Sequence, residues 1–321
     1  MLRRSIAGVL IALSSGSQVF AQGSYPNKPI KMVIAFAPGG PVDLTVRPVG
    51  QKLGEVLGQP VIMDYKVGGT ATIGTDYVAK SPADGYTLLI AASPHTINPS
   101  TQKSLPYDTL RDFTGVSPIG RSDIVLVSNP KLPVNNVQEL IALAKAKPGK
   151  LNFASSGTGG PLHLGGELLK MVAGIDMVHI PYKGGGPALQ DVVAGTADIA
   201  FVAAPPAVAQ IKAGKVKLLA IASLKRTEAF PDTPTVEEAG FPKFEITAAY
   251  GIVVPAGTPA ATISRLNGAL EKTLATAEIR QAFNRMGLAP WWMTAEQYTD
   301  WIREDIERWA AVAKAIKYQR E

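Results

Sequence analysis

The sequence predicts an α/β protein of two lobes, each a parallel-type sheet flanked by helices. Short apolar stretches of strand length alternate with longer stretches that repeat apolar residues at helical spacing. This alternation is typical of parallel strands joined by right-handed helical crossovers. The strands are continuously apolar, which indicates that helices cover both faces of each sheet. With 321 residues, the chain is long enough for two such units around one cleft.

The first sheet is predicted from the N-terminal third of the chain. Asp84-Gly85 is a turn signal directly before its third strand. A loop-rich stretch is expected over 93–113, after that strand. The strands are expected at 30–36, 61–64 and 86–92, and the intervening helices at 43–57 and 70–79.

The second sheet follows a strand at 124–127 and a helix at 137–146. Its strands are expected at 151–154, 177–180, 199–202 and 217–222, and its helices at 162–172, 187–193 and 206–212. The chain then returns as a strand at 250–254. Three closing helices are expected to pack on the first sheet, at 260–275, 278–286 and 295–316.

This order makes the chain cross between the lobes near 115–128 and again near 225–250. We therefore assign 22–122 with 250–321 to lobe 1, and 123–249 to lobe 2. Two crossing segments form a hinge, with a ligand cleft between the lobes.

Two glycine-paired loops stand at strand ends, where α/β sheets bind ligands. The first comprises Phe36, Ala37, Pro38, Gly39, Gly40, Pro41, Val42 and Asp43, and the second Ser155, Ser156, Gly157, Thr158, Gly159, Gly160, Pro161, Leu162 and His163. Each leads into a helix whose first N–H groups lack intrahelical partners. Glycine permits close approach of a ligand to that backbone, and the helix dipole favours a negative group. The pair predicts a cleft that holds an anion from both walls, although either loop alone is also compatible with a simple turn.

The N-terminal residues 1–21 are typical of a secretory signal peptide. Arg3 and Arg4 precede an apolar core, and Val19-Phe20-Ala21 fits a cleavage site that leaves Gln22 first. No later segment is long and apolar enough to span a bilayer. These features predict an exported protein of the periplasm.

Composition excludes several function classes. The chain has no cysteine, so it has no disulfide, thiol nucleophile or cysteine metal site. The formal charge is +6, but the basic residues are spread rather than clustered with aromatics, which argues against nucleic-acid binding. The second glycine loop is not followed by Gly-Lys-Ser/Thr, and it has Leu162 where the dinucleotide-binding fingerprint has glycine, which argues against nucleotide binding.

Further ligand-binding candidates lie near the same strand ends: Ser93, His95, His163, Ala203 and Ala204. His163 either lines the cleft or makes a structural hydrogen bond. Asp43 either caps its helix or orients a water or polar group of the ligand. The three histidines lack metal-binding spacing and no activated nucleophile is evident, so we expect no metal, no cofactor and no catalysis.

Several motifs together resemble the Bug family, the solute receptors of tripartite tricarboxylate transporters. They are Tyr25-Pro26 with Lys28-Pro29-Ile30, Phe36-Ala37-Pro38-Gly39-Gly40 with Asp43, Asp84-Gly85-Tyr86-Thr87-Leu88-Leu89, Leu105-Pro106-Tyr107-Asp108, His163-Leu164 with Gly166-Glu167, His179-Ile180-Pro181-Tyr182-Lys183-Gly184, and Pro255-Ala256-Gly257-Thr258-Pro259. The resemblance spans nearly the whole mature chain. It implies a periplasmic-binding-protein (Venus flytrap) fold whose two glycine loops hold a ligand carboxylate with the help of ordered water.

The resemblance also implies partners, and two other functions stay open beside it. The ligand would be a small organic carboxylate, such as a dicarboxylate or an aromatic acid, delivered by a monomeric receptor to integral membrane transporter subunits. A periplasmic carboxylate sensor or chemoreceptor ligand-binding protein is the alternative, and a hydrolytic enzyme is the third reading. The chain departs from the family pattern at Lys66, where an arginine is usual.

Overall fold

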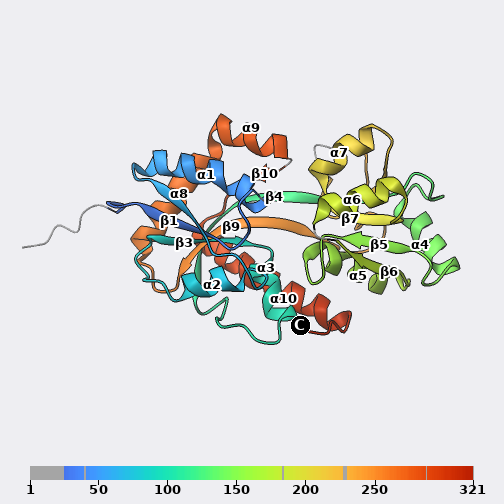
Figure 1. The fold of residues 1–321 in the computed structure, drawn as a ribbon, viewed down its shortest axis with the longest axis horizontal. Helices are drawn as coiled ribbons and strands as arrows, with labels where there is room; N and C mark the ends of the chain where they lie inside the picture. Colours follow the sequence, from blue (N-terminus) through green and yellow to red (C-terminus); the bar gives the residue numbers. More distant parts are fainter. Residues whose placement is uncertain (1–24, 40, 183, 227–229, 287, 321) are drawn as a thin grey trace, which may run out of the picture.

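The computed structural model describes residues 25–39, 41–182, 184–226, 230–286 and 288–320. The expected signal peptide and Gly40 lie outside this range. Figure 1 shows two groups of strands and helices side by side, connected by long strands through the middle. Among the described residues, no helix is both long enough and apolar enough to cross a membrane.

The first half contains three parallel strands. β1 (Ile30–Ile34) pairs in parallel with β2 (Val61–Tyr65) and with β3 (Thr87–Ala92). The helices between them are α1 (Pro41–Leu57) and α2 (Thr72–Ala79). The alternation predicted from the sequence is therefore confirmed here, to within a few residues at the element ends.

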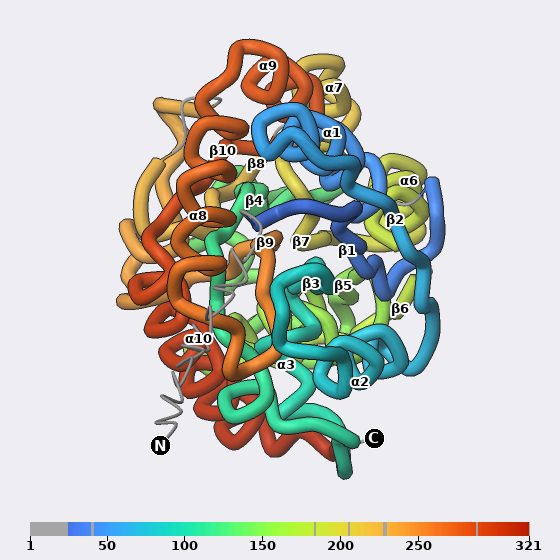
Figure 2. The backbone as a smooth tube through the Cα atoms, turned by 90° about the vertical axis from the view of Figure 1, so that its left-hand side faces the viewer, coloured from blue at the N-terminus to red at the C-terminus, as the bar shows by residue number. Residues whose placement is uncertain are grey.

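Helices cover both faces of this first sheet (Figure 2). One core cluster joins the strands to α1, α8 (Ala260–Ala275) and α9 (Ala277–Met286). A second cluster, on the opposite face, joins Val33, Leu89 and Val253 to α2 and to α10 (Ala295–Ala315).

The second half repeats this arrangement. Its parallel strands are β5 (Asn152–Ser155), β6 (Val178–Pro181) and β7 (Ile199–Ala203). A further strand, β8 (Lys217–Ile221), pairs in antiparallel with β4 (Phe113–Ser128), which connects the two halves. One of its two cores includes α4 (Val137–Ala146) and α5 (Pro161–Ala173). The other includes α6 (Gly185–Ala194) and α7 (Ala204–Lys212).

Two long strands connect the halves. β4 (Phe113–Ser128) has 16 residues, and β9 (Thr247–Pro255) is antiparallel to it. β4 pairs with β9 along its first part and with β7 and β8 along its last part. The sequence predicted only the last residues of β4, because Gly115, Pro118 and Gly120 interrupt its apolar pattern.

Three further features differ from the sequence prediction. A helix, α3 (Pro94–Thr101), occupies part of the stretch expected to be loop. A two-residue strand, β10 (Ala289–Pro290), pairs with β4. The last helix does not pack on the first sheet alone, because Trp309 and Val312 of α10 join the core of the second half. This helix is thus a third connection between the halves.

Strand directions decide where the loops lie. β1 and β3 run in the same direction as β4, because each is related to it through antiparallel β9. β5, β6 and β7 run in the opposite direction. Since β4 runs from the first half into the second, the carboxyl ends of the two strand sets point toward each other. Both glycine loops therefore follow strand ends that face the other half.

Candidate functional site

The first glycine loop is held by a buried carboxylate. Asp43 is only 1% exposed, and its Oδ2 accepts the backbone N–H of Gly39 at 2.7 Å. The Arg47 guanidinium donates to both carboxylate oxygens at 3.0 and 2.8 Å. The Tyr65 hydroxyl donates to Oδ1 at 2.6 Å. Asp43 thus ties the loop to its own helix and to the end of β2.

These contacts settle the protonation of Asp43. Burial alone would raise the pKa of its carboxyl, but hydrogen bonds from Tyr65, Arg47 and the Gly39 backbone hold the pKa below its ordinary value. The carboxylate is therefore charged at neutral pH, and Arg47 balances that charge. The sequence left open a helix cap or a contact to the ligand or its water; the contact seen in the structure is a different one, from Asp43 back to the Gly39 N–H in the loop.

The second glycine loop is held by Ser155 at its start. The Ser155 hydroxyl donates to the carbonyl oxygen of Gly157 at 2.9 Å and accepts the Gly157 N–H at 3.3 Å. Nε2 of His179 lies 2.7 Å from the hydroxyl oxygen of Ser155. Which of the two groups donates in the Ser155–His179 contact depends on the His179 tautomer. The contact ties the start of the loop to β6, the strand that carries His179.

The end of this loop is held by His163. Its Nδ1 accepts the backbone N–H of Gly159 at 3.0 Å. The imidazole stacks on His179 with ring centroids 3.9 Å apart, and Phe153 of the neighbouring strand β5 also stacks on His179. Gly159 has φ +76°, a backbone conformation that favours glycine, and an added Cβ would lie 3.0 Å from the Tyr318 hydroxyl.

Each loop presents an unused donor. Among the described residues, the backbone N–H groups of Ala37 and Thr158 have no hydrogen-bond partner, and both residues are exposed. Ala37 lies in the first loop and Thr158 in the second. A negative group placed between the halves would find a free N–H of an exposed residue on each side, in a loop that leads into a helix.

The other predicted residues lie at the same sheet edges. Ala203 ends β7 and Ala204 begins α7, on the edge that carries the second loop. Ser93 precedes α3 at the end of β3, on the edge of the first loop. His95 differs from these, because it is 4% exposed and neither ring nitrogen has a partner among the described residues.

Sequence reasoning missed the residues that hold the loops. Arg47 follows Asp43 at i+4, so this ion pair was readable from spacing alone. Tyr65 and His179 come from neighbouring strands, and only the strand pairing brings them to the loops. Lys66, where the family pattern has arginine, lies 3.2 Å from Asp64 in an ion pair.

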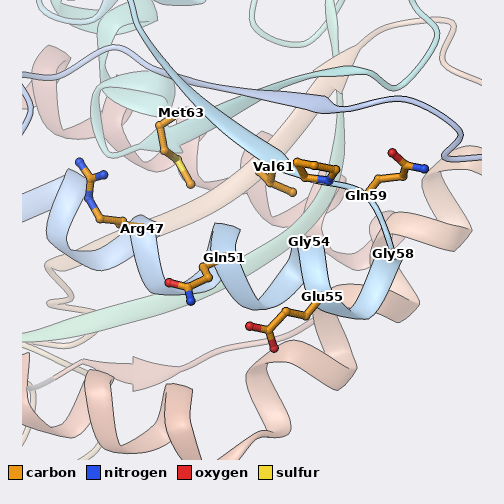
Figure 3. Close-up of a pocket in the computed structure, with 9 residues that line it drawn as sticks. Arg47, Gln51, Gly54, Glu55, Gly58, Gln59, Val61 and Met63 are labelled. Carbon is orange, nitrogen blue, oxygen red and sulfur yellow. The ribbon is translucent and has the colours of Figure 1, made fainter.

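A separate groove of about 500 Å³ lies between α1 and β2 (Figure 3). Arg47 stands at one end and Gln59 at the other, with Gln51, Glu55 and Met63 between them. Apart from Arg47, it shares no residue with the glycine-loop contacts described above. No group of three or more metal-ligating side chains occurs in the part of the chain that the structure describes.

Comparison with known proteins gives concordant matches. The model of the family described as "Tripartite tricarboxylate transporter family receptor" matches residues 45–318. Protein BugT of Bordetella pertussis is 36% identical over 97% of this chain and 96% of its own length.

Solved structures agree in fold. The periplasmic binding protein BugD matches with a TM-score of 0.77 and 30% identity, over 92% of this chain and 100% of its own. Rpa4515 of R. palustris with adipate matches with a TM-score of 0.80 and 30% identity, over 92% and 100% of the two chains. MatC of Rhodopseudomonas palustris with bound malate matches with a TM-score of 0.74 and 29% identity, over 90% of this chain and 99% of its own. The two-lobed periplasmic-binding-protein fold expected from the sequence is confirmed.

Proposed function

The chain belongs to the tripartite tricarboxylate transporter receptor family, and on this premise we propose that it captures a small organic carboxylate between its two lobes. The loaded receptor would deliver this ligand to the integral membrane subunits of a tripartite tricarboxylate-type transporter. The observation that carries the proposal is the pair of facing loops, each with a free backbone N–H beside a helix start.

The ligand class is supported by the different acids bound in two structural neighbours. One is described with adipate and the other with malate, and both are dicarboxylates. A dicarboxylate or an aromatic acid would place one carboxylate between the loops. Since Arg47 is committed to Asp43, backbone N–H groups rather than a free cation would provide the recognition.

The proposed site comprises residues from both lobes. Ala37 and Thr158 would donate to the carboxylate, and Ala203 and Ala204 would leave room for the rest of the ligand. His95 would contribute only if its ring became accessible on ligand binding. The remaining members are Phe36, Pro38, Gly39, Gly40, Val42, Asp43, Ser93, Ser155, Ser156, Gly157 and His163.

The same proposal covers location and motion. The mature protein would begin at Gln22, after cleavage behind Ala21, and act in the periplasm as a monomer. Residues 22–122 with 250–321 would form one moving lobe and 123–249 the other. The lobes would close on the ligand without chemical change, with β4 and β9 as the connecting strands.

A thermal-shift screen tests this function. Adipate, malate and an aromatic acid are each compared with the matching amide. An acid at 100 times its Kd should stabilise the protein by about 2.7 kcal/mol, which raises Tm by several degrees. The amide should give almost no shift, because it lacks the anion that the N–H groups bind. Equal shifts from acid and amide, or release of a product from the acid, would contradict the proposal.

A further inference from the structure

The two glycine loops follow one five-residue pattern. Each has two glycines, a proline, an aliphatic residue and a residue with a hydrogen-bond acceptor, at 39–43 and at 159–163. The proline is the first residue of the helix in both, at Pro41 and Pro161. The first glycine has nearly the same φ in each, +77° at Gly39 and +76° at Gly159.

The fifth residue has the same contact in both loops. Asp43 Oδ2 accepts the N–H of Gly39 at 2.7 Å, and His163 Nδ1 accepts the N–H of Gly159 at 3.0 Å. Both side chains are buried, at 1% and 7% exposure. Each therefore ties the left-handed glycine back onto the first turn of the helix that follows it. The acceptor atom is two bonds from Cβ in both side chains, so Asp43 and His163 can hold the glycine N–H at a similar distance from their helix.

We propose that His163 is the positioning residue of the second loop, the counterpart of Asp43 in the first. Both fix the loop backbone from which the ligand's carboxylate is bound. The two acceptors differ in one respect: a carboxylate oxygen accepts whenever it is charged, whereas Nδ1 accepts only while the imidazole is neutral. The second loop is thus held by a contact that a single proton removes.

The surroundings keep His163 neutral at pH 7. Burial, and then the charge of Lys170, lower the pKa of His163 to about 4. From α5 itself, Glu167 lies 4.0 Å from Nε2, and Lys170 pairs with Glu167. From β6, His179 stacks on the ring, and from the C-terminal segment Tyr318 meets its edge. A proton on Nδ1 would face the Gly159 N–H and end that hydrogen bond.

Two variants separate the acceptor from the ring. His163→Phe keeps an aromatic ring for stacking but has no acceptor. His163→Asn loses the ring but places an oxygen at the position of Nδ1. In ligand-free protein labelled with ¹⁵N, hydrogen exchange at the Gly159 amide should accelerate about tenfold in His163→Phe, corresponding to a lost hydrogen bond. His163→Asn should keep the wild-type protection.

The first loop is the internal control. The Gly39 amide, bound by Asp43, should exchange at the same rate in both variants. In the wild-type protein at pH 7, ¹⁵N spectra should show His163 with an unprotonated Nδ1, whether or not either variant folds. An Nδ1–H tautomer, unchanged protection of Gly159 in His163→Phe, or loss of protection in a folded His163→Asn would each overturn the proposal.

The functional consequence rests on the function proposed above and is measured separately. With adipate and malate as probes, His163→Phe should bind whichever acid the wild type binds about tenfold more weakly, and His163→Asn should be near wild type. If the wild type binds no carboxylate, the proposed function fails while the Gly159 measurement still stands. If the wild type binds and His163→Phe binds equally well, the positioning role is wrong and the function stands.

Discussion

Replacing Asp43 by asparagine tests whether the first glycine loop depends on a charged, buried acceptor. The carboxylate accepts hydrogen bonds from Gly39, Arg47 and Tyr65, and it is 1% exposed. Asparagine has similar size but keeps only one acceptor oxygen and adds two donors. It cannot satisfy all three donors, and its amide would face the Arg47 guanidinium.

The magnitude follows from these contacts. Hydrogen bonds to a charged group contribute about 1.5–3 kcal/mol each, and the two from the half-exposed Arg47 contribute less than the others. Asparagine keeps about half of the four bonds, so we expect a loss of about 3 kcal/mol. For a chain of this length the fall in Tm is about 5 °C or more. Urea unfolding of wild type and Asp43→Asn at pH 7 measures the difference directly.

The pH dependence gives the same variant a second readout. The folded-state pKa of Asp43 lies below its ordinary 3.8, so the stability from its charge is present above that value. It is lost only as the pH falls through the folded pKa. The gap between wild type and Asp43→Asn should stay constant from pH 7 to about pH 4 and close below it.

Asp300→Asn is the matched control. Asp300 pairs with Arg303 on an exposed helix face, with more than half of its side chain accessible. Exposed pairs of this kind contribute about 0.5 kcal/mol or less. If Asp43→Asn were no more destabilising than Asp300→Asn, the proposed role of Asp43 in holding the loop would be refuted.

Three other substitutions have defined outcomes. Gly39→Val should weaken carboxylate binding about tenfold in titration calorimetry. No atom lies within 4 Å of the added Cβ, but the φ of +77° is unfavourable for a branched side chain, so the loop backbone would have to change. Unchanged affinity would exclude the loop from the site. His95→Phe should keep the packing against Phe113 and remove a pH-dependent loss of stability. Burial lowers the His95 pKa to about 4, so the wild type loses about 2 kcal/mol between pH 8 and pH 5 as the pH falls below the unfolded-state pKa of about 6.5, and the variant does not. Parallel pH–stability curves of the two proteins would refute this. Ala71→Gly should change the free energy of unfolding in urea by less than about 0.5 kcal/mol, because relief of the left-handed φ of +72° is offset by loss of a buried methyl group. A loss of about 2 kcal/mol or more would contradict that reasoning.

The sequence predicted most helices and strands because each buries a regular apolar pattern. β4 was predicted only in part, since Gly115, Pro118 and Gly120 read as loop. In the structure the pairing of β4 with β9 shifts register between Gly115 and Ser117 and again between Pro118 and Gly120. Such irregularities admit glycine and proline into a strand, and local sequence gives no sign of the partner that makes them possible.

The helix α3 was missed for a related reason. Its residues include Pro94, Pro99 and several polar side chains, which favour turns when considered alone. In the structure most of these residues are buried, and α3 packs against α10. The stability of α3 therefore comes from packing against a helix distant in sequence rather than from helix propensity.

The site was predicted at the level of loops rather than contacts. Glycine, proline and their place after strands marked both loops, and the spacing of Asp43 and Arg47 was visible. The contacts between Tyr65 and Asp43 and between His179 and Ser155 depend on which strands lie side by side. No single sequence pattern specifies that pairing.

The central claim is that both loops together bind one carboxylate through backbone N–H groups. A crystal structure of the protein with an acid selected in the thermal screen tests it most directly. We predict carboxylate oxygens within hydrogen-bond distance of the N–H groups of Ala37 and Thr158, directly or through one water. A carboxylate bound by one loop alone, or seated in the groove between α1 and β2, would contradict the account.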